Sequence, residues 1–192
     1  AFLRLPVVWW CFSFFLLSTV ALAVVQSFAP SILEKVHGVS VEVATYTLSA
    51  YMLSGAFGML VGGFVAHSTQ FSDRVVASAM TAGGLLMLVC ASGVLGGTGT
   101  LVGLAMTGFS VGIGGPSRDL MIKRATPAGA TGRVYGTVYS GLDTGFALSP
   151  LIFGRLMDHG HYTITLAGAG VALLASVVAV VAVGRHLHGR AA

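Results

Sequence analysis

The sequence predicts an all-α, multi-pass membrane helical bundle with six transmembrane helices. Two observations favour this class. Of the 192 residues, 55% are hydrophobic and only 8% are charged, whereas a typical soluble domain carries about 25% charged residues. The apolar residues also gather in long runs, and a helix that crosses a bilayer needs roughly 20 such residues. A chain of this composition has too few charged groups to cover a surface in water.

Polar breaks divide the chain into six apolar runs. A backbone in lipid must satisfy its own hydrogen bonds, and these runs are too long and too uniform for barrel strands, so each is expected to form a helix. A shift of 91 residues lays Ser49, Leu60 and Gly63 on Ser140, Leu151 and Gly154, and with so few identities an internal three-helix repeat is suggested mainly by hydropathy. The predicted spans, within a single bundle over residues 1–192, cover residues 7–29, 43–66, 75–96, 99–122, 134–157 and 162–184.

The first run could be mistaken for a signal peptide. It begins AFLRLPVVWWCFSFFLLSTVALAV, with Arg4 before an apolar stretch and Ala-Leu-Ala at 21–23, as a cleaved leader would have. The run continues to Ala29, however, and this length favours a membrane span. Because the chain starts with Ala1 and not Met, we expect a processed chain or a piece of a longer protein, with a complete half-size protein as the alternative.

The six runs differ in polar content. The third and sixth contain no charged or large polar side chain, so they are expected to face lipid. The first carries Gln26, the second carries Tyr46 and Tyr51, the fourth ends in GPSRD and the fifth contains Asp143. Polar groups in hydrocarbon are costly unless they face a bundle interior or water. The first, second, fourth and fifth helices are therefore predicted to line a cavity, with Gln26, Tyr46 and Tyr51 among the substrate-site candidates.

Lysine and arginine predict the orientation. Short cytoplasmic loops collect these residues, and only Lys35 and Arg155 would be outside if the N-terminus is inside. Both termini are therefore expected in the cytoplasm, and the net charge of +4 requires no nucleic-acid partner. The basic residues on the predicted inner side are Arg4, Arg74, Arg118, Lys123, Arg124, Arg133, Arg185 and Arg190.

Glycine is abundant, with 27 residues, and much of it is spaced by four. Small residues at this spacing let two helix backbones approach closely, so we predict packing seams at these positions. The pairs are Gly58 with Gly62, Gly108 with Gly112, Gly132 with Gly136, and Gly141 with Gly145.

Asp143 is the main functional candidate. It follows the last basic residue of the preceding loop by ten positions, which places it roughly 15 Å into a core about 30 Å thick. Helical spacing puts Tyr139 and Pro150 on its side, with Gly141 and Gly145 opposite, and Pro150 is expected to kink the helix. We predict that Asp143 and Tyr139 contribute to a substrate or proton site; the alternative is a neutral carboxyl group that only holds a neighbouring helix.

The inner ends of the helices supply candidate gate residues. Arg118 and Asp119, at the end of the fourth span, are interpreted as an inner gate, with an interfacial anchor as the alternative role for Arg118. Asp73 and Arg74, between the second and third spans, are assigned to the same gate. The histidines lie near span ends and lack helical ligand spacing within a span, so neither a metal site nor a cofactor is expected.

Two segments resemble the carboxy-terminal half of a bacterial major facilitator superfamily (MFS) transporter. They are GPSRDLMIKRATPAGATGRVYGTVYSGLDTGFALSPLIFGRLMDHG and PSILEKVHGVSVEVATYTLSAYMLSGAFGMLVGGFVAH. The resemblance implies a six-helix half of a twelve-helix secondary carrier that moves a small molecule by alternating access, often coupled to protons, in the bacterial plasma (inner) membrane. It also implies that the first, second, fourth and fifth helices line the cavity. The partner would be a missing N-terminal six-helix bundle or a homodimer mate.

One loop departs from the pattern of that family. After Gly63 an acidic residue is expected four positions on, but His67 stands there, and Asp73 with Arg74 follows six positions later. The inner gate of this half therefore departs from the family pattern, while the predicted fold is unaffected.

Two other functions compete with the carrier. In GFSVG, Ser110 occupies the fourth span near the place where a rhomboid-type intramembrane protease keeps its nucleophile. Such chemistry needs a histidine base at the same depth, which the sixth span lacks, and the serine is not followed by glycine. The other alternative is a non-transporting structural or regulatory membrane subunit. We therefore expect a transporter and no enzyme.

Overall fold

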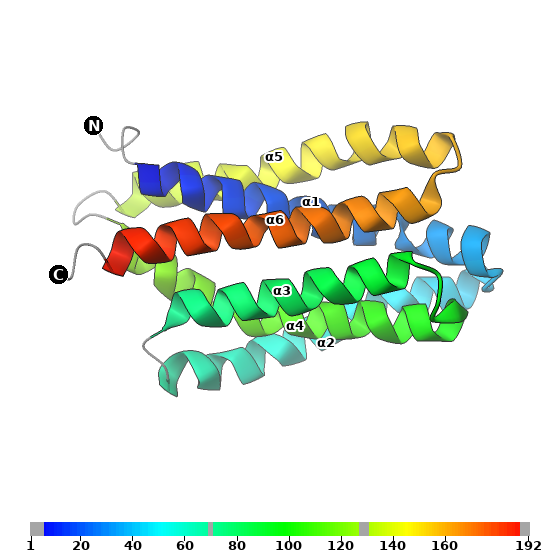
Figure 1. The fold of residues 1–192 in the computed structure, drawn as a ribbon, viewed down its shortest axis with the longest axis horizontal. Helices are drawn as coiled ribbons and strands as arrows, with labels where there is room; N and C mark the ends of the chain where they lie inside the picture. Colours follow the sequence, from blue (N-terminus) through cyan, green and yellow to red (C-terminus); the bar gives the residue numbers. More distant parts are fainter. Residues whose placement is uncertain (1–5, 69–70, 127–130, 189–192) are drawn as a thin grey trace.

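A computed structural model describes residues 6–68, 71–126 and 131–188 of the chain (Figure 1). It confirms the predicted fold class, because each of the six predicted spans forms a helix and the described residues contain no strand. The helices are α1 (Pro6–His37), α2 (Val41–Ser68), α3 (Ser72–Ala91), α4 (Gly96–Ala125), α5 (Thr131–Asp158) and α6 (Tyr162–His188).

Two helix ends differ most from the predicted limits. α1 continues through Pro30 to His37 and stops before Gly38, which has a φ of 63°. α3 ends at Ala91, five residues before the predicted limit, although Val94 and Leu95 extend the apolar run. Gly93 and Gly96 have φ values of 75° and 64°, and this left-handed conformation is available to glycine without the clash of a Cβ atom. Hydropathy alone does not detect such a turn.

α5 is the least lipid-like helix of the six. The other five are long and apolar enough to cross a membrane, whereas α5 does not meet that criterion despite its 28 residues. Arg133, Asp143 and Arg155, together with several hydroxyl side chains, lower its hydropathy. A helix of this composition needs neighbours other than lipid on part of its surface.

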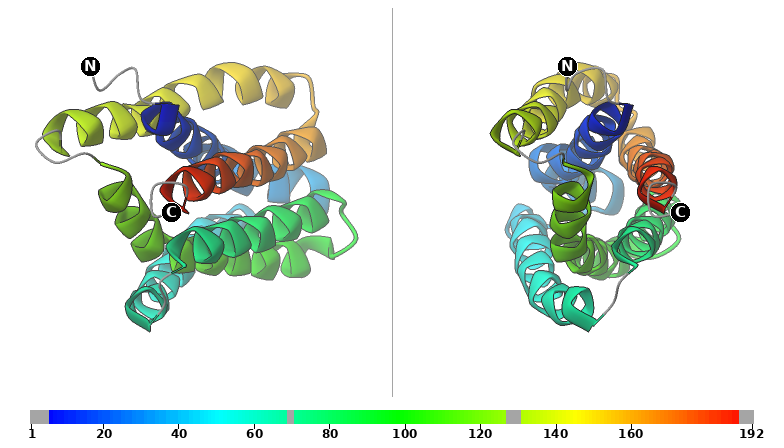
Figure 2. Two further views of the ribbon diagram at one scale, coloured as in Figure 1. Left: turned by 60° about the vertical axis from the view of Figure 1, so that its left-hand side comes forward. Right: turned by 90° about the vertical axis from the view of Figure 1, so that its left-hand side faces the viewer.

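The helices pack in an order that differs from their order in the chain. α1 packs against α5 and α6, α4 packs against α2 and α3, and α3 packs against α6, while α5 and α6 touch only slightly. Viewed along the bundle, α3 and α6 lie on one side and α2 and α5 lie at separate edges of the opposite side (Figure 2). If α1–α3 and α4–α6 are taken as two trios, the second helix of each trio packs on the first helix of the other, α2 on α4 and α5 on α1. This exchange is the arrangement that a three-helix repeat predicts.

The seam between α2 and α4 consists largely of glycine. A Cβ atom at any of Gly58, Gly62, Gly108 or Gly112 would overlap a backbone carbonyl oxygen of the opposite helix. The predicted packing of these two pairs is therefore confirmed. The backbones can approach this closely because no side chain separates them.

α2 is otherwise poorly covered. Only 17% of its most apolar stretch is buried, against 39% to 56% for the other four candidate spans. Leu53, Phe57, Leu60 and Phe64 are each 61% to 80% exposed. The core instead lies along α1, α3, α4 and α6, where its largest buried side chains include Phe14, Phe15, Leu33, Met87, Leu104, Met121 and Leu173.

The two ends of the bundle differ in charge. The starts of α1, α3 and α5 and the ends of α2, α4 and α6 lie together at one end (Figure 1), which we call the basic end. Among the described residues, Lys35 and Arg155 lie near the opposite end, and the basic end carries the other lysine and arginine residues. Those residues are Arg74, Arg118, Lys123, Arg124, Arg133 and Arg185.

Candidate functional site

Asp143 lies on an open side of α5. Its side chain is exposed, as are those of Ala147 and Pro150. No atom of the described chain lies within 4 Å of a Cβ built at Gly136 or Gly154. The stripe that helical spacing predicted around Asp143 is therefore uncovered over most of its length.

The opposite side of α5 packs closely on α1. A Cβ at Gly141 would lie 2.7 Å from the Phe12 carbonyl oxygen, and one at Gly145 would lie 2.8 Å from the Leu16 carbonyl oxygen. The prediction that these two glycines form a packing seam is confirmed, and it fixes the direction in which Asp143 points. Gly132 and Gly136 meet nothing within 4 Å in the part of the chain that is described, so no described helix packs against this pair.

An aromatic–guanidinium cluster joins α1, α4 and α5 on the basic-end side of Asp143. The Arg118 guanidinium lies 4.9 Å from the centre of the Phe15 ring, close enough for a cation–π interaction. The Phe15 and Tyr139 rings are 5.0 Å apart, and Tyr139 stacks on Tyr135 at 5.8 Å. Tyr139 is half-buried as a result and contacts α1 through this cluster.

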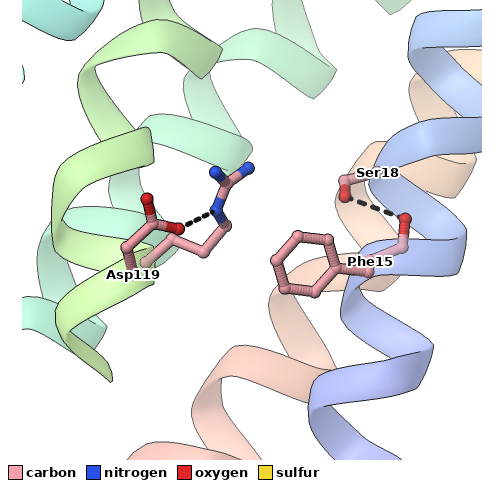
Figure 3. A network of polar contacts seen from close by, with 4 residues as sticks. Phe15, Ser18 and Asp119 are labelled. Atoms are coloured by element: carbon pink, nitrogen blue, oxygen red, sulfur yellow. Dashed lines mark hydrogen bonds and ion pairs between the residues drawn. The ribbon is translucent and has the colours of Figure 1, made fainter. Parts of the chain in front are cut away.

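No pattern in the sequence indicates the role of Phe15. It is one of four phenylalanines in an apolar helix, and only the packing of α1 on α5 identifies it. In Figure 3 its ring points toward the Arg118–Asp119 pair, and the Ser18 hydroxyl donates to the Phe15 carbonyl oxygen at 3.2 Å.

Arg118 and Asp119 pair with each other. Arg118 Nε donates to Asp119 Oδ1 at 3.0 Å (Figure 3), and the two side chains are 26% and 52% exposed. Asp119 also lines a pocket of about 720 Å³ at the basic end, between α2, α4 and the start of α5. His67, Lys123 and Tyr135 line the same pocket. Because Tyr135 stacks on Tyr139, the pocket adjoins the aromatic–guanidinium cluster.

The other two gate candidates lie elsewhere. Asp73 and Arg74, at the start of α3, line a separate groove with Arg185 of α6. Arg74 also lies over the Phe71 ring at 4.6 Å. The structure therefore divides the four predicted gate residues between two places and does not join them in one contact.

The remaining substrate-site candidates are scattered. Tyr51 is buried on α2 against Gly108. Tyr46 lies nearer the start of the same helix, away from the basic end, and is 67% exposed. Gln26 is half-buried on α1. Neither the basic-end pocket nor the groove beside Leu53 and Phe57 is lined by any of them or by Asp143. Their assignment to one site stays a prediction.

Ser110 has a structural partner. Its hydroxyl donates to the Ala79 carbonyl oxygen at 2.8 Å and so ties α4 to α3. A protease nucleophile would need a hydrogen bond to a base, and in the described residues this hydroxyl is engaged with a backbone oxygen.

Comparisons with known proteins identify the family. Residues 11–191 match the model of the Major Facilitator Superfamily, while no curated protein and no solved structure matches the chain. The match covers most of every described helix, and six helices fit one half of the architecture that the sequence implied. The chain therefore belongs to the Major Facilitator Superfamily, whose members are multi-pass membrane transporters.

Proposed function

We propose that this chain forms one half of a secondary carrier that moves a small molecule across a membrane by alternating access. The observation that supports this most directly is the exposed Asp143 on the open side of α5. An ionisable side chain in a membrane helix is costly in lipid and normally faces a bundle interior or a watery cavity. Asp143 therefore needs a surface or a cavity that the described helices do not provide.

A second six-helix body would provide that surface. α2 and α5 lie at separate edges of one side of the bundle (Figure 2) and both expose apolar side chains there. We propose that either an N-terminal six-helix bundle or a second copy of this chain packs against these edges. The cavity enclosed between the two bodies would then receive Asp143.

In this carrier, Asp143 takes up a proton or contacts a cationic or polar solute. Tyr139 lies one helical turn closer to the basic end and stacks on Tyr135, which lines the same pocket as Asp119. The Arg118–Asp119 pair then stands at the inner mouth. We place the carrier in a bacterial plasma (inner) membrane with both termini and the basic end in the cytoplasm, because basic residues favour that side.

The test is flux through the full-length transporter in proteoliposomes, with a panel of drugs, organic acids and sugars, with and without an uncoupler. For a substrate that is carried, Asp143→Asn should strongly lower gradient-driven uptake, because the variant keeps the shape of the side chain but can no longer take up or release a proton. Asp158→Asn, which removes an exposed carboxylate at the end of the same helix, is the matched control.

The possible results separate the alternatives. Unchanged gradient-driven flux in Asp143→Asn would exclude this carboxyl group as a proton or cation site. Absence of flux for every class of solute in the intact protein would favour the non-transporting membrane subunit instead.

A further inference from the structure

A second polar site lies on the side of the bundle that the proposed carrier does not use. It is a groove of about 380 Å³ at the basic end, between the start of α3 and the end of α6. α3 and α6 lie on the side opposite to α2 and α5 (Figure 2), so a second six-helix body on the α2–α5 side would leave this groove facing lipid. Its lining residues are Asp73, Arg74, Ala77, Val181, Gly184 and Arg185.

The charge that this groove presents outward is positive. Arg74 and Arg185 are exposed, whereas Asp73 is half-buried. The Asp73 carboxylate lies against the backbone of α6, where a Cβ at Gly184 would come within 2.5 Å of its oxygen. The acid is therefore turned into the contact between the helices, and the two guanidinium groups remain at the surface.

Both arginines stand at the basic end of an exposed apolar stripe. On α6, Val171 and Val178 are 56% and 64% exposed, and with Arg185 they recur every seven residues along one face. On α3, Leu85 and Val89 are 52% and 46% exposed and lie farther from the basic end than Arg74. Two apolar tracks thus run from the arginines into the depth of the membrane.

We propose that the groove between α3 and α6 binds an anionic phospholipid, with its phosphate on Arg74 and Arg185 and its acyl chains along the two apolar stripes. Guanidinium groups bind phosphate through paired hydrogen bonds. Basic pockets between membrane helices on the cytoplasmic side are suited to anionic headgroups. The apolar stripes favour a lipid over free phosphate, because a free anion would leave them uncovered.

The experiment measures lipid binding to the purified full chain in a neutral detergent by native mass spectrometry. Dioleoyl phosphatidylglycerol is compared with dioleoyl phosphatidylcholine, and inorganic phosphate is added as a competitor. We expect preferential retention of phosphatidylglycerol, weakened about 30-fold in the Arg74→Gln/Arg185→Gln variant, since two basic side chains near an anionic surface are lost. Lys123→Gln/Arg133→Gln removes the same charge at the same end on the other side and should change binding little.

Two further measurements distinguish a loss of lipid binding from misfolding. Arg74→Lys/Arg185→Lys keeps the charge but loses the paired hydrogen bonds, so its preference for phosphatidylglycerol should lie between those of the unaltered chain and the Gln double variant. Circular dichroism with size exclusion checks that each variant is folded. The proposal is overturned by equal retention of the two lipids, by equal losses in the two Gln double variants, or by displacement of the lipid by inorganic phosphate at matched concentration.

Discussion

The close seam between α1 and α5 predicts opposite effects of one substitution at two glycines of the same helix. At Gly141 an added Cβ would lie 2.7 Å from the Phe12 carbonyl oxygen, whereas ordinary contact begins at 3.4 Å. The nearest atom belongs to the backbone, so α5 must move away from α1 by the difference, about 0.7 Å. Overpacking of this kind costs about 1–3 kcal/mol, while the better helix propensity of alanine returns up to ~1 kcal/mol.

Gly141→Ala should therefore destabilise the protein by about 1 kcal/mol on balance. Gly136→Ala is the matched control, because nothing lies within 4 Å of its Cβ position and only the gain in propensity remains, about 0.4–1 kcal/mol. The two variants should differ by ~2 kcal/mol, or by about 4–8 °C in Tm for a chain of this size.

The assay is thermal unfolding of the two purified variants and the unaltered chain in one detergent, followed by circular dichroism. The sign of the effect matters more than its size. If Gly141→Ala unfolds at or above the temperature of Gly136→Ala, the backbones of α1 and α5 do not approach as described, and the orientation of Asp143 loses its support.

Two further predictions concern α2 and the proline of α5. Gly62→Ala should lower the free energy of unfolding by about 1–2 kcal/mol, because Gly62 meets the backbone of α4, whereas Gly63→Ala has open space; equal Tm values for the two variants would refute the seam. Pro150→Ala should restore a backbone donor to α5 and slow the transport cycle of the full-length protein several-fold (on the order of 1 kcal/mol in barrier), and an unchanged turnover rate would count against a gating kink.

The number and order of the helices could be predicted because hydropathy is a property of each segment alone. The end of α3 could not be predicted from hydropathy, because Val94 and Leu95 are as apolar as the helix before them. The helix ends because Gly93 and Gly96 adopt positive φ values. α5 was predicted as a span from its apolar run between polar breaks, although it falls short of the apolar criterion that the other five helices meet.

The candidate site was predictable only in part, because spacing gives relative and not absolute directions. Helical spacing placed Gly141 and Gly145 opposite Asp143, and the structure confirms this because both glycines pack on the backbone of α1. It treated Gly132 and Gly136 as equivalent to them, but a glycine pair packs only where another helix is present. Contacts between helices, such as Arg118 over Phe15, depend on tertiary packing that no local pattern contains.

The exchange of partners between the two helix trios has a consequence for how the protein assembles during synthesis. α2 and α5 find their main contacts on α4 and α1, which belong to the other trio. When only α1, α2 and α3 have emerged, α2 therefore lacks its glycine seam and α3 lacks both of its principal neighbours. Insertion into the membrane can proceed helix by helix, but α2 and α3 gain their contacts with α4 only when the fourth helix arrives, and α1 and α3 gain theirs with α6 only when the sixth is in place. A nascent chain stalled after α3 would keep only the limited contact between α1 and α2, and its uncovered helix faces would be open to mispairing with other membrane helices.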